Sequence, residues 1–304
     1  MQPAQQRLNI IGCGKAGRAI ARLFVQQQLF TLGAIANRSM RSSGQAVAFV
    51  GAGEAVQDHP AAMGAAALWL IGTGDDAIAP AAQVLAESGV LRAGDVVFHL
   101  SGATPSSALD ACRRLGAFTA SVHPVKNFSD PAVAARSFSG TWCGCEGDAS
   151  ALAVLEPAFA ALGARLFRID ARYKALYHGG GAFACNFIPV LIELAMRCEE
   201  RAGIARETAL AMFEPIARET LDAVFRQGIA PAFAGPISRG DAGSVRRHLT
   251  AMAEFDPRVS ALYAGLGEIG LDLVTSLRRV EPARIEATRA AMHSPAAASG
   301  ASAP

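Results

Sequence analysis

A short glycine-rich segment near the start of the chain constrains its fold more than any other feature. The apolar run 8–11 predicts a strand, and the amphipathic run 18–24 predicts a helix. Between them stands the pattern G-x-G-x-x-G, with Gly12, Gly14 and Gly17 as its glycines. The first glycine permits a tight turn, the second admits a pyrophosphate, and the third allows the helix to pack closely on the strand. The segment therefore predicts a dinucleotide-binding domain built on a doubly wound sheet.

The same segment predicts where the phosphates of a nucleotide bind. The first N–H groups of a helix have no partner inside the helix, and the positive end of the helix dipole attracts anions. Glycine-rich turns also bind single nucleotides and methyl donors, so the pattern alone leaves that alternative open. The cofactor-binding residues that we expect in this turn are Gly12, Cys13, Gly14, Lys15, Ala16 and Gly17.

The residues after the second predicted strand, 32–36, indicate which dinucleotide is bound. A domain specific for NAD places an acidic residue roughly twenty residues beyond the last glycine, where it holds the ribose 2′-hydroxyl. This chain has Asn37, Arg38 and Ser39 there instead. The planar guanidinium of Arg38 can pair with a 2′-phosphate, which favours NADP over NAD as the cofactor. The alternative is that these three residues only cap the next helix and face water.

Length and composition restrict the remaining possibilities. The chain has 304 residues, of which 51% are hydrophobic and 18% charged, as is typical of a compact protein with two domains. A net charge of +2 without a run of Lys or Arg argues against a nucleic-acid partner and favours a small-molecule substrate. The apolar stretch 187–196 contains Pro189 and Glu193 and is too short to cross a bilayer, so we expect no membrane partner. No secretory signal is visible, and the expected location is the cytoplasm.

The six cysteines predict reduced thiols. Their spacing in a chain of this size is typical of buried, unpaired cysteines. Cys143 and Cys145 have no second pair nearby, so alternate positions on one face of a strand explain them better than metal binding does. We therefore expect no metal ion.

A second turn of small residues follows the third predicted strand, 67–71, and consists of Gly72, Thr73 and Gly74. The carboxyl ends of the strands face the ligand crevice in a doubly wound sheet. We therefore expect this turn beside the nicotinamide half of the cofactor. Asp75, which comes next, is better interpreted as a helix N-cap than as a catalytic acid.

The next two predicted strands, 95–100 and 117–122, end at Ser101 and His123. A hydroxyl at Ser101 is placed to meet a substrate, although a turn serine is an equal alternative. A histidine has a pKa near neutrality that suits proton transfer, and Pro124 stiffens the turn after His123. A structural role for His123 is the alternative.

From about residue 171 the sequence predicts helices only. The first, 171–201, carries Lys174 and His178 one turn apart, with Asn186 two turns further on the same broad side. Three consecutive glycines, 179–181, interrupt it at a cost of about 2 to 3 kcal/mol relative to alanine. A close approach of cofactor, substrate or another helix explains that cost, and a kink for packing is the alternative.

Further helices are predicted over 206–226, over 244–263 and up to about residue 292. The loop 234–241 offers Arg239 to a substrate carboxylate, or serves only to present Asp241 as a helix cap. The last residues are Ala, Ser, Gly and Pro and are expected to be disordered. The predicted domains are an α/β Rossmann domain with a doubly wound, mostly parallel sheet over 1–170, an all-α domain over 171–292 and a tail over 293–304.

Seven motifs, taken together, carry a family resemblance. They are 11–17, Ser101-Gly102, His-Pro-Val-Lys-Asn-Phe at 123–128, Glu-Gly-Asp at 146–148, Lys174 with Tyr177-His178, Asn186-Phe187 and 235–241. The chain resembles a bacterial family of Rossmann-like proteins that carry a C-terminal domain of unknown function numbered 2520. The resemblance covers nearly the whole chain except its tail. It implies an NADP-dependent oxidoreductase without an established substrate.

The layout is more distantly similar to pyrroline-5-carboxylate reductases, ketopantoate reductases, 3-hydroxyisobutyrate and 6-phosphogluconate dehydrogenases, and prephenate dehydrogenases. Those families share a Rossmann domain, a helical domain that often dimerises, and catalysis in the cleft between them. The lysine and asparagine of the hydroxyisobutyrate enzymes resemble Lys174 and either His178 or Asn186. The His-Pro of prephenate dehydrogenases resembles His123-Pro124. The similarity implies a homodimer formed through the helical domain.

These residues define the function that we expect. An oxidoreductase of this type transfers a hydride between NADP and a small carbonyl, imine or hydroxy-acid substrate. Lys174 would polarise the carbonyl or relay a proton, and His123 or His178 would be the acid or base. Ser101 and Asn186 would hold the reacting oxygen, and Arg239 a carboxylate. The candidate catalytic residues are thus Lys174, His123, His178, Ser101, Asn186 and Arg239; the alternative function is that of a non-catalytic NADP-binding redox sensor.

Overall fold

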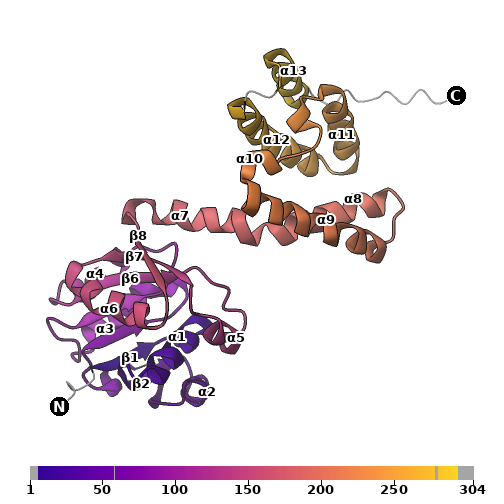
Figure 1. The fold of residues 1–304 in the computed structure, drawn as a ribbon. Helices are drawn as coiled ribbons and strands as arrows, with labels where there is room; N and C mark the ends of the chain where they lie inside the picture. The colour runs from indigo at the N-terminus through magenta and orange to yellow at the C-terminus, as the bar shows by residue number, and fades with distance from the viewer. Residues whose placement is uncertain (1–5, 58, 278–279, 294–304) are drawn as a thin grey trace. The chain divides into compact units, whose positions relative to one another are not determined.

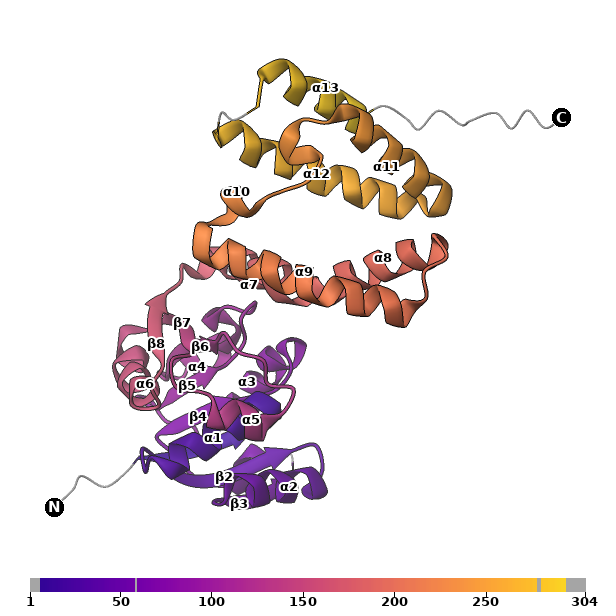
Figure 2. The same cartoon turned by 45° about the vertical axis from the view of Figure 1, so that its right-hand side comes forward.

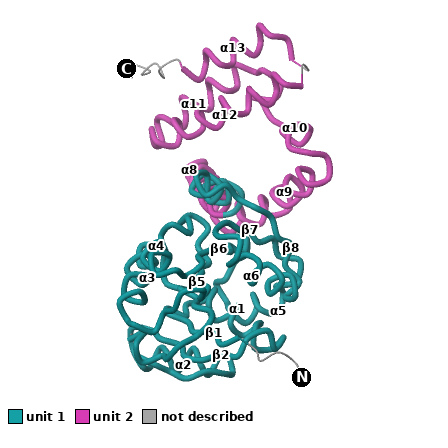
Figure 3. The backbone as a smooth tube through the Cα atoms, turned by 90° about the vertical axis from the view of Figure 1, so that its left-hand side faces the viewer, with its two compact units in different colours: residues 1–185 teal, residues 186–304 magenta. Residues whose placement is uncertain are grey.

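The computed structural model describes residues 6–57, 59–277 and 280–293. The chain divides into two compact units, 1–185 and 186–304 (Figure 3). The sequence placed this division at residue 170, before the helical residues that close the first unit. Of the predicted tail 293–304, only His293 is described, as the last residue of a helix; the remainder lies outside the described residues.

The first unit is built on one sheet of mostly parallel strands, as the sequence predicts. Its order is β3-β2-β1-β4-β5-β6-β7-β8, and β6 and β7 form the antiparallel pair in the described sheet. The fully buried β4 is a continuous apolar run, as expected for a strand covered on both faces. The strands are β1 (Arg7–Ile11), β2 (Thr31–Asn37), β3 (Glu54–Gln57), β4 (Leu68–Ile71), β5 (Val96–His99), β6 (Phe118–Pro124), β7 (Trp142–Gly147) and β8 (Arg165–Arg168).

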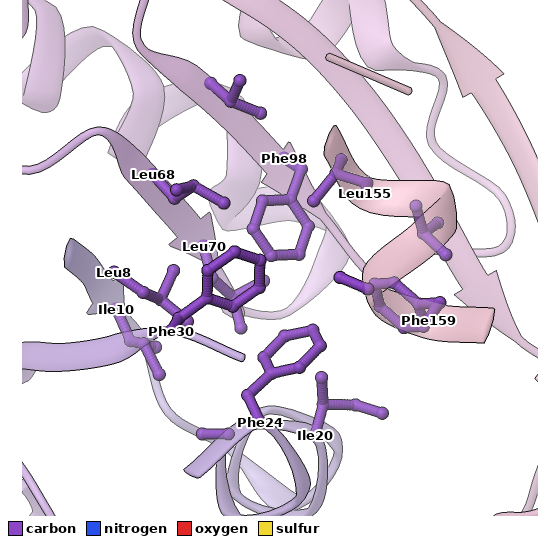
Figure 4. Packing of buried hydrophobic residues seen from close by; sticks show 14 of the residues in the cluster. Leu8, Ile10, Ile20, Phe24, Phe30, Leu68, Leu70, Phe98, Leu155 and Phe159 are labelled. Atoms are coloured by element: carbon purple, nitrogen blue, oxygen red, sulfur yellow. The ribbon is translucent and has the colours of Figure 1, made fainter. Parts of the chain in front are cut away.

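Helices cover both faces of the sheet (Figures 1 and 2). One core cluster joins the sheet to α1, α2 and α6, and a second joins its other face to α3 and α4. In the first cluster Phe24 of α1 packs edge-on against Phe30 and Phe159, with ring centroids 5.0 and 5.4 Å away (Figure 4). The helices are α1 (Lys15–Gln26), α2 (Met40–Val50), α3 (Ile78–Glu87), α4 (Asp110–Arg113), α5 (Pro131–Arg136), α6 (Ala149–Ala161) and α7 (Lys174–Gly181).

A buried asparagine fixes the register between β1 and β2. Leu8 pairs with Leu32 but Ile10 pairs with Ile35, so β2 carries one extra residue there. The side chain of Asn9 compensates, because its Oδ1 accepts the N–H of Ala34 at 2.8 Å. This bulge keeps the backbone hydrogen bonds satisfied just before the ends of both strands, where the glycine turn begins.

Several predicted element boundaries are wrong. The short strand β3 was not predicted. After Pro105 the chain forms a 3₁₀ turn (Ser106–Leu109) followed by the one-turn α4. The single helix expected over 171–201 consists of a 3₁₀ turn (Ala171–Tyr173), α7, a π-helical turn (Ala182–Asn186) and α8 (Ile188–Arg201). A run of three glycines favours such an interruption because glycine has a low helix propensity.

The second unit is helical throughout its described residues, and a small core joins α11, α12 and α13. The helix predicted over 244–263 is wrong because Asp256 leaves the helix and Pro257 starts the next one. No single described helix has both the length and the apolar composition to cross a membrane; one bent pair, 171–186 with 188–201, passes by those criteria alone. The remaining elements are α9 (Arg206–Gln227), α10 (Ile229–Ala232), a 3₁₀ turn (Ile237–Arg239), α11 (Ala242–Phe255), α12 (Pro257–Leu277) and α13 (Pro282–His293).

Candidate functional site

Two glycine turns touch at the carboxyl ends of β1 and β4. Gly12 has a φ of +77°, and a Cβ atom there would lie 2.4 Å from Cγ2 of Thr73. A Cβ on Gly72 would lie 2.5 Å from the carbonyl oxygen of Gly12. Both positions therefore require glycine. At Gly17, by contrast, a Cβ would make ordinary contacts of 3.6 and 3.7 Å, so the structure leaves room for a methyl group there.

These turns line a cavity of about 870 Å³ in the first unit. Two of the twelve predicted cofactor-binding residues, Ala16 and Gly17, do not line it. Arg18 is a lining residue that the sequence did not single out for this site, and Ser42, which the sequence favours as an additional hydrogen-bonding group for the 2′-phosphate, lines it as well. The predicted residues that line it are Gly12, Cys13, Gly14, Lys15, Asn37, Arg38, Ser39, Gly72, Thr73 and Gly74.

The polar groups of this cavity fit a nucleotide. Helix α1 begins there without a side-chain cap and without an acidic residue in its first turn. Its first N–H groups are therefore available to phosphate, with Lys15 adding positive charge. Two buried polar atoms, Nδ2 of Asn37 and Oγ1 of Thr73, have no hydrogen-bond partner within the described chain. Buried polar groups are normally satisfied, so these two atoms indicate a ligand with hydrogen-bonding groups of its own.

For residues 37–39 the sequence left two roles open, cofactor binding and capping of the next helix, and the three residues do not share one role. Oγ of Ser39 accepts the N–H of Ser42 at 3.3 Å, so Ser39 caps α2. Oδ1 of Asn37 accepts the N–H of Cys13 at 2.7 Å and thereby holds the glycine turn. Arg38 is exposed at the cavity and forms no salt bridge with any residue that the structure describes.

A buried ion pair lies next to the sheet. Lys174, the first residue of α7, is 1% exposed, and its Nζ donates to Oε1 of Glu146 at 2.8 Å. Ser106 donates to both oxygens of that carboxylate, from its N–H at 2.8 Å and its Oγ at 2.7 Å. We call Lys174, Glu146 and Ser106 the ion-pair cluster. Burial lowers the pKa of Lys174, and the contact with Glu146 opposes that shift.

One helical turn later, α7 supplies a second group of residues. Oη of Tyr177 lies 2.9 Å from Nδ1 of His123, at the end of β6. The ring of His123 stands edge-on to the rings of Tyr177 and His178, with centroids 5.6 and 5.7 Å away. We call these three residues the histidine–tyrosine cluster. A Cβ on Gly102 would lie 2.4 Å from the ring of His178 and 2.7 Å from that of His123, so both rings require a glycine there.

The two rings of the His123–Tyr177 pair are neutral near pH 7. Burial, together with the charges of His178 and Lys174, lowers the pKa of His123 to about 4, and the charge of Asp75 opposes that shift. Burial raises the pKa of Tyr177 to about 12. The pair therefore enters any reaction as an imidazole and a phenol.

Ser101 and His99 organise the loop after β5. Oγ of Ser101 accepts the N–H groups of Ala103 and Thr104, at 3.2 and 2.9 Å, so this hydroxyl closes a turn. Nδ1 of the buried His99 accepts the N–H of Ser101 at 3.2 Å. Because that bond requires an unprotonated Nδ1, the ring proton is on Nε2, which donates to the carbonyl oxygen of Pro105 at 3.3 Å.

Two candidate catalytic residues belong to the second unit. Arg239 lines a different cavity there, of about 860 Å³, together with Asp272 and Arg284. Asp241 caps α11 by accepting the N–H of Ser244 at 3.0 Å. Asn186 is exposed and is the first residue of this unit. Within the first unit the structure thus brings together His123, Lys174, His178 and Ser101.

Glu146 and Tyr177 were not among the predicted site residues. Glu146 is a buried charge on β7, whose other buried residues are small or apolar. A buried lysine requires an acidic partner, but the sequence does not show that Lys174 is buried. Tyr177 lies three residues after Lys174, and this helical spacing is the signal that places it on a related face. Among the described residues, no group of three or more His, Cys, Asp or Glu is arranged to hold a metal ion.

Sequence models of known domains match both parts of the chain. A Rossmann-like domain matches residues 1–124, and a domain of unknown function, number 2520, matches residues 141–269. The first unit therefore belongs to the Rossmann-like class. The chain thus matches a Rossmann-like domain followed by domain 2520. No curated protein matches it.

Solved structures confirm the fold. A protein from Thermotoga maritima is 22% identical, with a TM-score of 0.69, and the match covers 90% of this chain and 100% of that one. A candidate NADP oxidoreductase from Bacteroides fragilis is 20% identical, with a TM-score of 0.66 and coverage of 88% and 98%. An imine reductase from Streptomyces aurantiacus is 19% identical, with a TM-score of 0.57 and coverage of 90% and 100%. At this level of identity the likeness concerns the fold.

Proposed function

We propose that the protein is an NADP-dependent oxidoreductase that transfers a hydride to or from a small carbonyl, imine or hydroxy-acid substrate. The observation that carries this proposal is the position of two sites along one edge of the sheet. The nucleotide-type cavity lies at the ends of β1 and β4, and Ser101 and His123 lie at the ends of β5 and β6. These four strands are neighbours in the order β1-β4-β5-β6. Ligands of doubly wound sheets bind along that edge.

The cofactor supplies the hydride when it is bound, and the chain supplies binding, orientation and a proton. The N-terminus of α1 and Lys15 would hold its pyrophosphate, and Arg38 its 2′-phosphate. Charges act between the two sites, because Asp75, just after the second glycine turn, raises the pKa of both His123 and Lys174. A solved neighbour described as an NADP oxidoreductase and another described as an imine reductase support the same class.

Calorimetric titration with NADPH and NADH tests the cofactor assignment. We expect micromolar binding of NADPH and at least about tenfold weaker binding of NADH, a difference of about 1.4 kcal/mol. Arg38→Ala should remove that difference and leave NADH binding unchanged. Arg41→Ala is the matched control, because Arg41 is equally exposed on α2 but does not line the cavity. Equal affinity for both cofactors in the wild type would assign NAD instead.

Substrate screening separates an enzyme from the alternative, a redox sensor. NADPH oxidation should be followed with 2-oxo acids, other ketones and cyclic imines, and NADP reduction with hydroxy acids. Turnover with one of these classes supports an oxidoreductase. Tight NADPH binding without turnover on any of them would favour the sensor.

We also propose that the protein forms a homodimer through its helical residues. Large apolar side chains are exposed along α8, α9 and the start of α10, and an accumulation of exposed apolar side chains is typical of an interaction site. Sedimentation at micromolar concentration should show a dimer, and a monomer would contradict the proposal. The exposed residues are Val190, Leu191, Leu210, Met212, Ile216, Leu221, Phe225 and Ile229.

A further inference from the structure

We propose that Tyr177 is the group that exchanges a proton with the substrate, and that His123 relays that proton from behind it. This inference rests on the proposed oxidoreductase function and names its acid. The pair is joined by the 2.9 Å contact between Oη of Tyr177 and Nδ1 of His123. No comparison with a known protein assigns a role to either residue.

Two of the other candidate groups, Lys174 and Ser101, are already hydrogen-bonded within the chain. Nζ of Lys174 is buried against Glu146, and its side chain is 1% exposed. The carboxylate of Glu146 in turn accepts three hydrogen bonds, including two from Ser106. Oγ of Ser101 accepts two backbone N–H groups. A buried, saturated ion pair holds structure, since moving its proton would leave an unpaired charge.

Tyr177 and His123, by contrast, are only partly buried. Nδ1 of His123 has Tyr177 as its partner, while the Nε2 side of the ring faces the backbone of Gly102. An imidazole accepts a proton on one nitrogen as it gives one up from the other. The ring chemistry of His123 therefore allows it to take up a proton at Nε2 and pass the proton on Nδ1 to Tyr177.

The reductive direction balances as follows. The hydride from the cofactor adds to the substrate carbon, and the π electrons of the C=O or C=N bond move to the heteroatom. The heteroatom takes the phenolic proton of Tyr177. The phenolate takes the proton from Nδ1 of His123, and Nε2 takes one from a solvent water, which is left as hydroxide. The substrate thus gains one hydride and one proton, and exchange with water returns the ring proton to Nδ1.

The relay requires a particular tautomer of His123. Its ring proton must be on Nδ1 and donated to Oη of Tyr177, because the phenolic proton is then free for the substrate. Nitrogen NMR of imidazole-labelled protein, free and with NADPH, measures this directly. We expect the Nδ1–H form, with a shift of its signal in Tyr177→Phe. The Nε2–H form would mean that Tyr177 donates to the ring, and it would overturn the inference without any substrate.

A second histidine–tyrosine pair in the helical unit provides a matched control. Nδ1 of His248 lies 3.0 Å from Oη of Tyr263, and the rings are also edge-on at 5.7 Å. Tyr177→Phe should lower kcat at least about 100-fold, as is typical of losing a general acid, and leave the Kd for NADPH unchanged. Tyr263→Phe should leave both unchanged. A kcat within threefold of wild type in Tyr177→Phe would remove Tyr177 from the mechanism.

Failure of this inference is distinguishable from failure of the proposed function. If the wild-type protein does not bind NADPH, the proposed oxidoreductase function is rejected, whatever the tautomer of His123. Normal NADPH binding with the Nε2–H tautomer would reject only the relay. His123→Asn adds a third readout, because a relay residue should alter the pH profile of kcat, whereas a residue that only packs should not.

Discussion

Helix α7 contributes to two polar groups of opposite character. Its first residue enters the ion-pair cluster, where Lys174, Glu146 and Ser106 are buried and every charged atom has a partner. Three residues later it enters the histidine–tyrosine cluster, whose rings are partly exposed and joined by one hydrogen bond. Removing a proton from the ion-pair cluster would leave an unpaired buried charge, which costs free energy. The histidine–tyrosine cluster can exchange a proton without leaving such a charge. The difference supports our proposal that Lys174 positions the helix and that Tyr177, one turn further on, exchanges the proton.

The largest expected effect concerns the ion-pair cluster. Lys174→Met leaves the carboxylate of Glu146 buried without its cation, which should lower the free energy of unfolding by about 3 to 5 kcal/mol. Urea denaturation measures the change. The double variant Lys174→Met/Glu146→Gln should recover much of the loss, because it removes the unpaired charge. Arg172→Met, which removes an exposed ion pair with Asp170, is the control and should have no measurable effect. A decrease in the free energy of unfolding below about 1 kcal/mol for Lys174→Met would contradict the structural role of the ion-pair cluster.

A smaller effect follows from His99, which the charge of Lys174 helps to keep neutral. Burial and that charge lower the pKa of His99 in the folded state to about 3, from a reference of 6.5. Between these values the unfolded state binds more protons, so stability is fully present above about pH 6.5 and falls as the pH decreases toward 3. At pH 5 the loss should be about 2 kcal/mol.

Urea denaturation of wild type and His99→Gln over pH 5 to 7.5 isolates the contribution of His99 to the pH dependence of the free energy of unfolding. The variant should show a smaller decrease in stability at low pH than the wild type does. Equal slopes would mean that His99 has the same pKa in the folded and the unfolded state. That result would also contradict its hydrogen bond with the N–H of Ser101.

The smallest predicted effect distinguishes the first glycine of the G-x-G-x-x-G pattern from the last. Gly12→Ala places a methyl group against Thr73 at a φ that favours glycine, and should weaken NADPH binding at least about tenfold, or about 1.4 kcal/mol. Gly17→Ala meets only ordinary contacts and should leave the affinity within about twofold. Calorimetry on both variants checks the difference. Equal losses of NADPH affinity in the two variants would indicate that Gly17 is also needed for close packing of the helix on the strand.

The fold was predictable from the sequence because its signals are local. The strand-turn-helix segment 8–24 and the apolar run 67–71 each specify one βα unit, and repetition of such units specifies the sheet. Proline also marks boundaries, yet the break at Pro257 was missed because the flanking residues are good helix formers. The weakly apolar β3, Glu54–Gln57, gave no comparable signal.

The candidate site was predictable only in part because its contacts are between distant residues. His123 was identified from its position at the end of a strand, and Lys174 from its helical spacing to His178. Their roles depend on Glu146 and Tyr177, which are 28 residues from Lys174 and 54 from His123 in the chain. No local pattern states which of two nearby side chains is buried. That knowledge comes from the packing of α7 beside β6 and β7.

The antiparallel pairing of β6 with β7 makes one spacing in α7 indispensable. Glu146 is level with Ser121 of β6, and His123 lies two residues further along that strand. Lys174 and Tyr177 reach these two levels because three helical residues advance about 4.5 Å. One residue inserted between them would rotate Tyr177 by about 100° while leaving the ion pair intact. Such a chain would keep the ion pair but have no phenol beside His123, so the length between Lys174 and Tyr177 must be kept for the histidine–tyrosine contact.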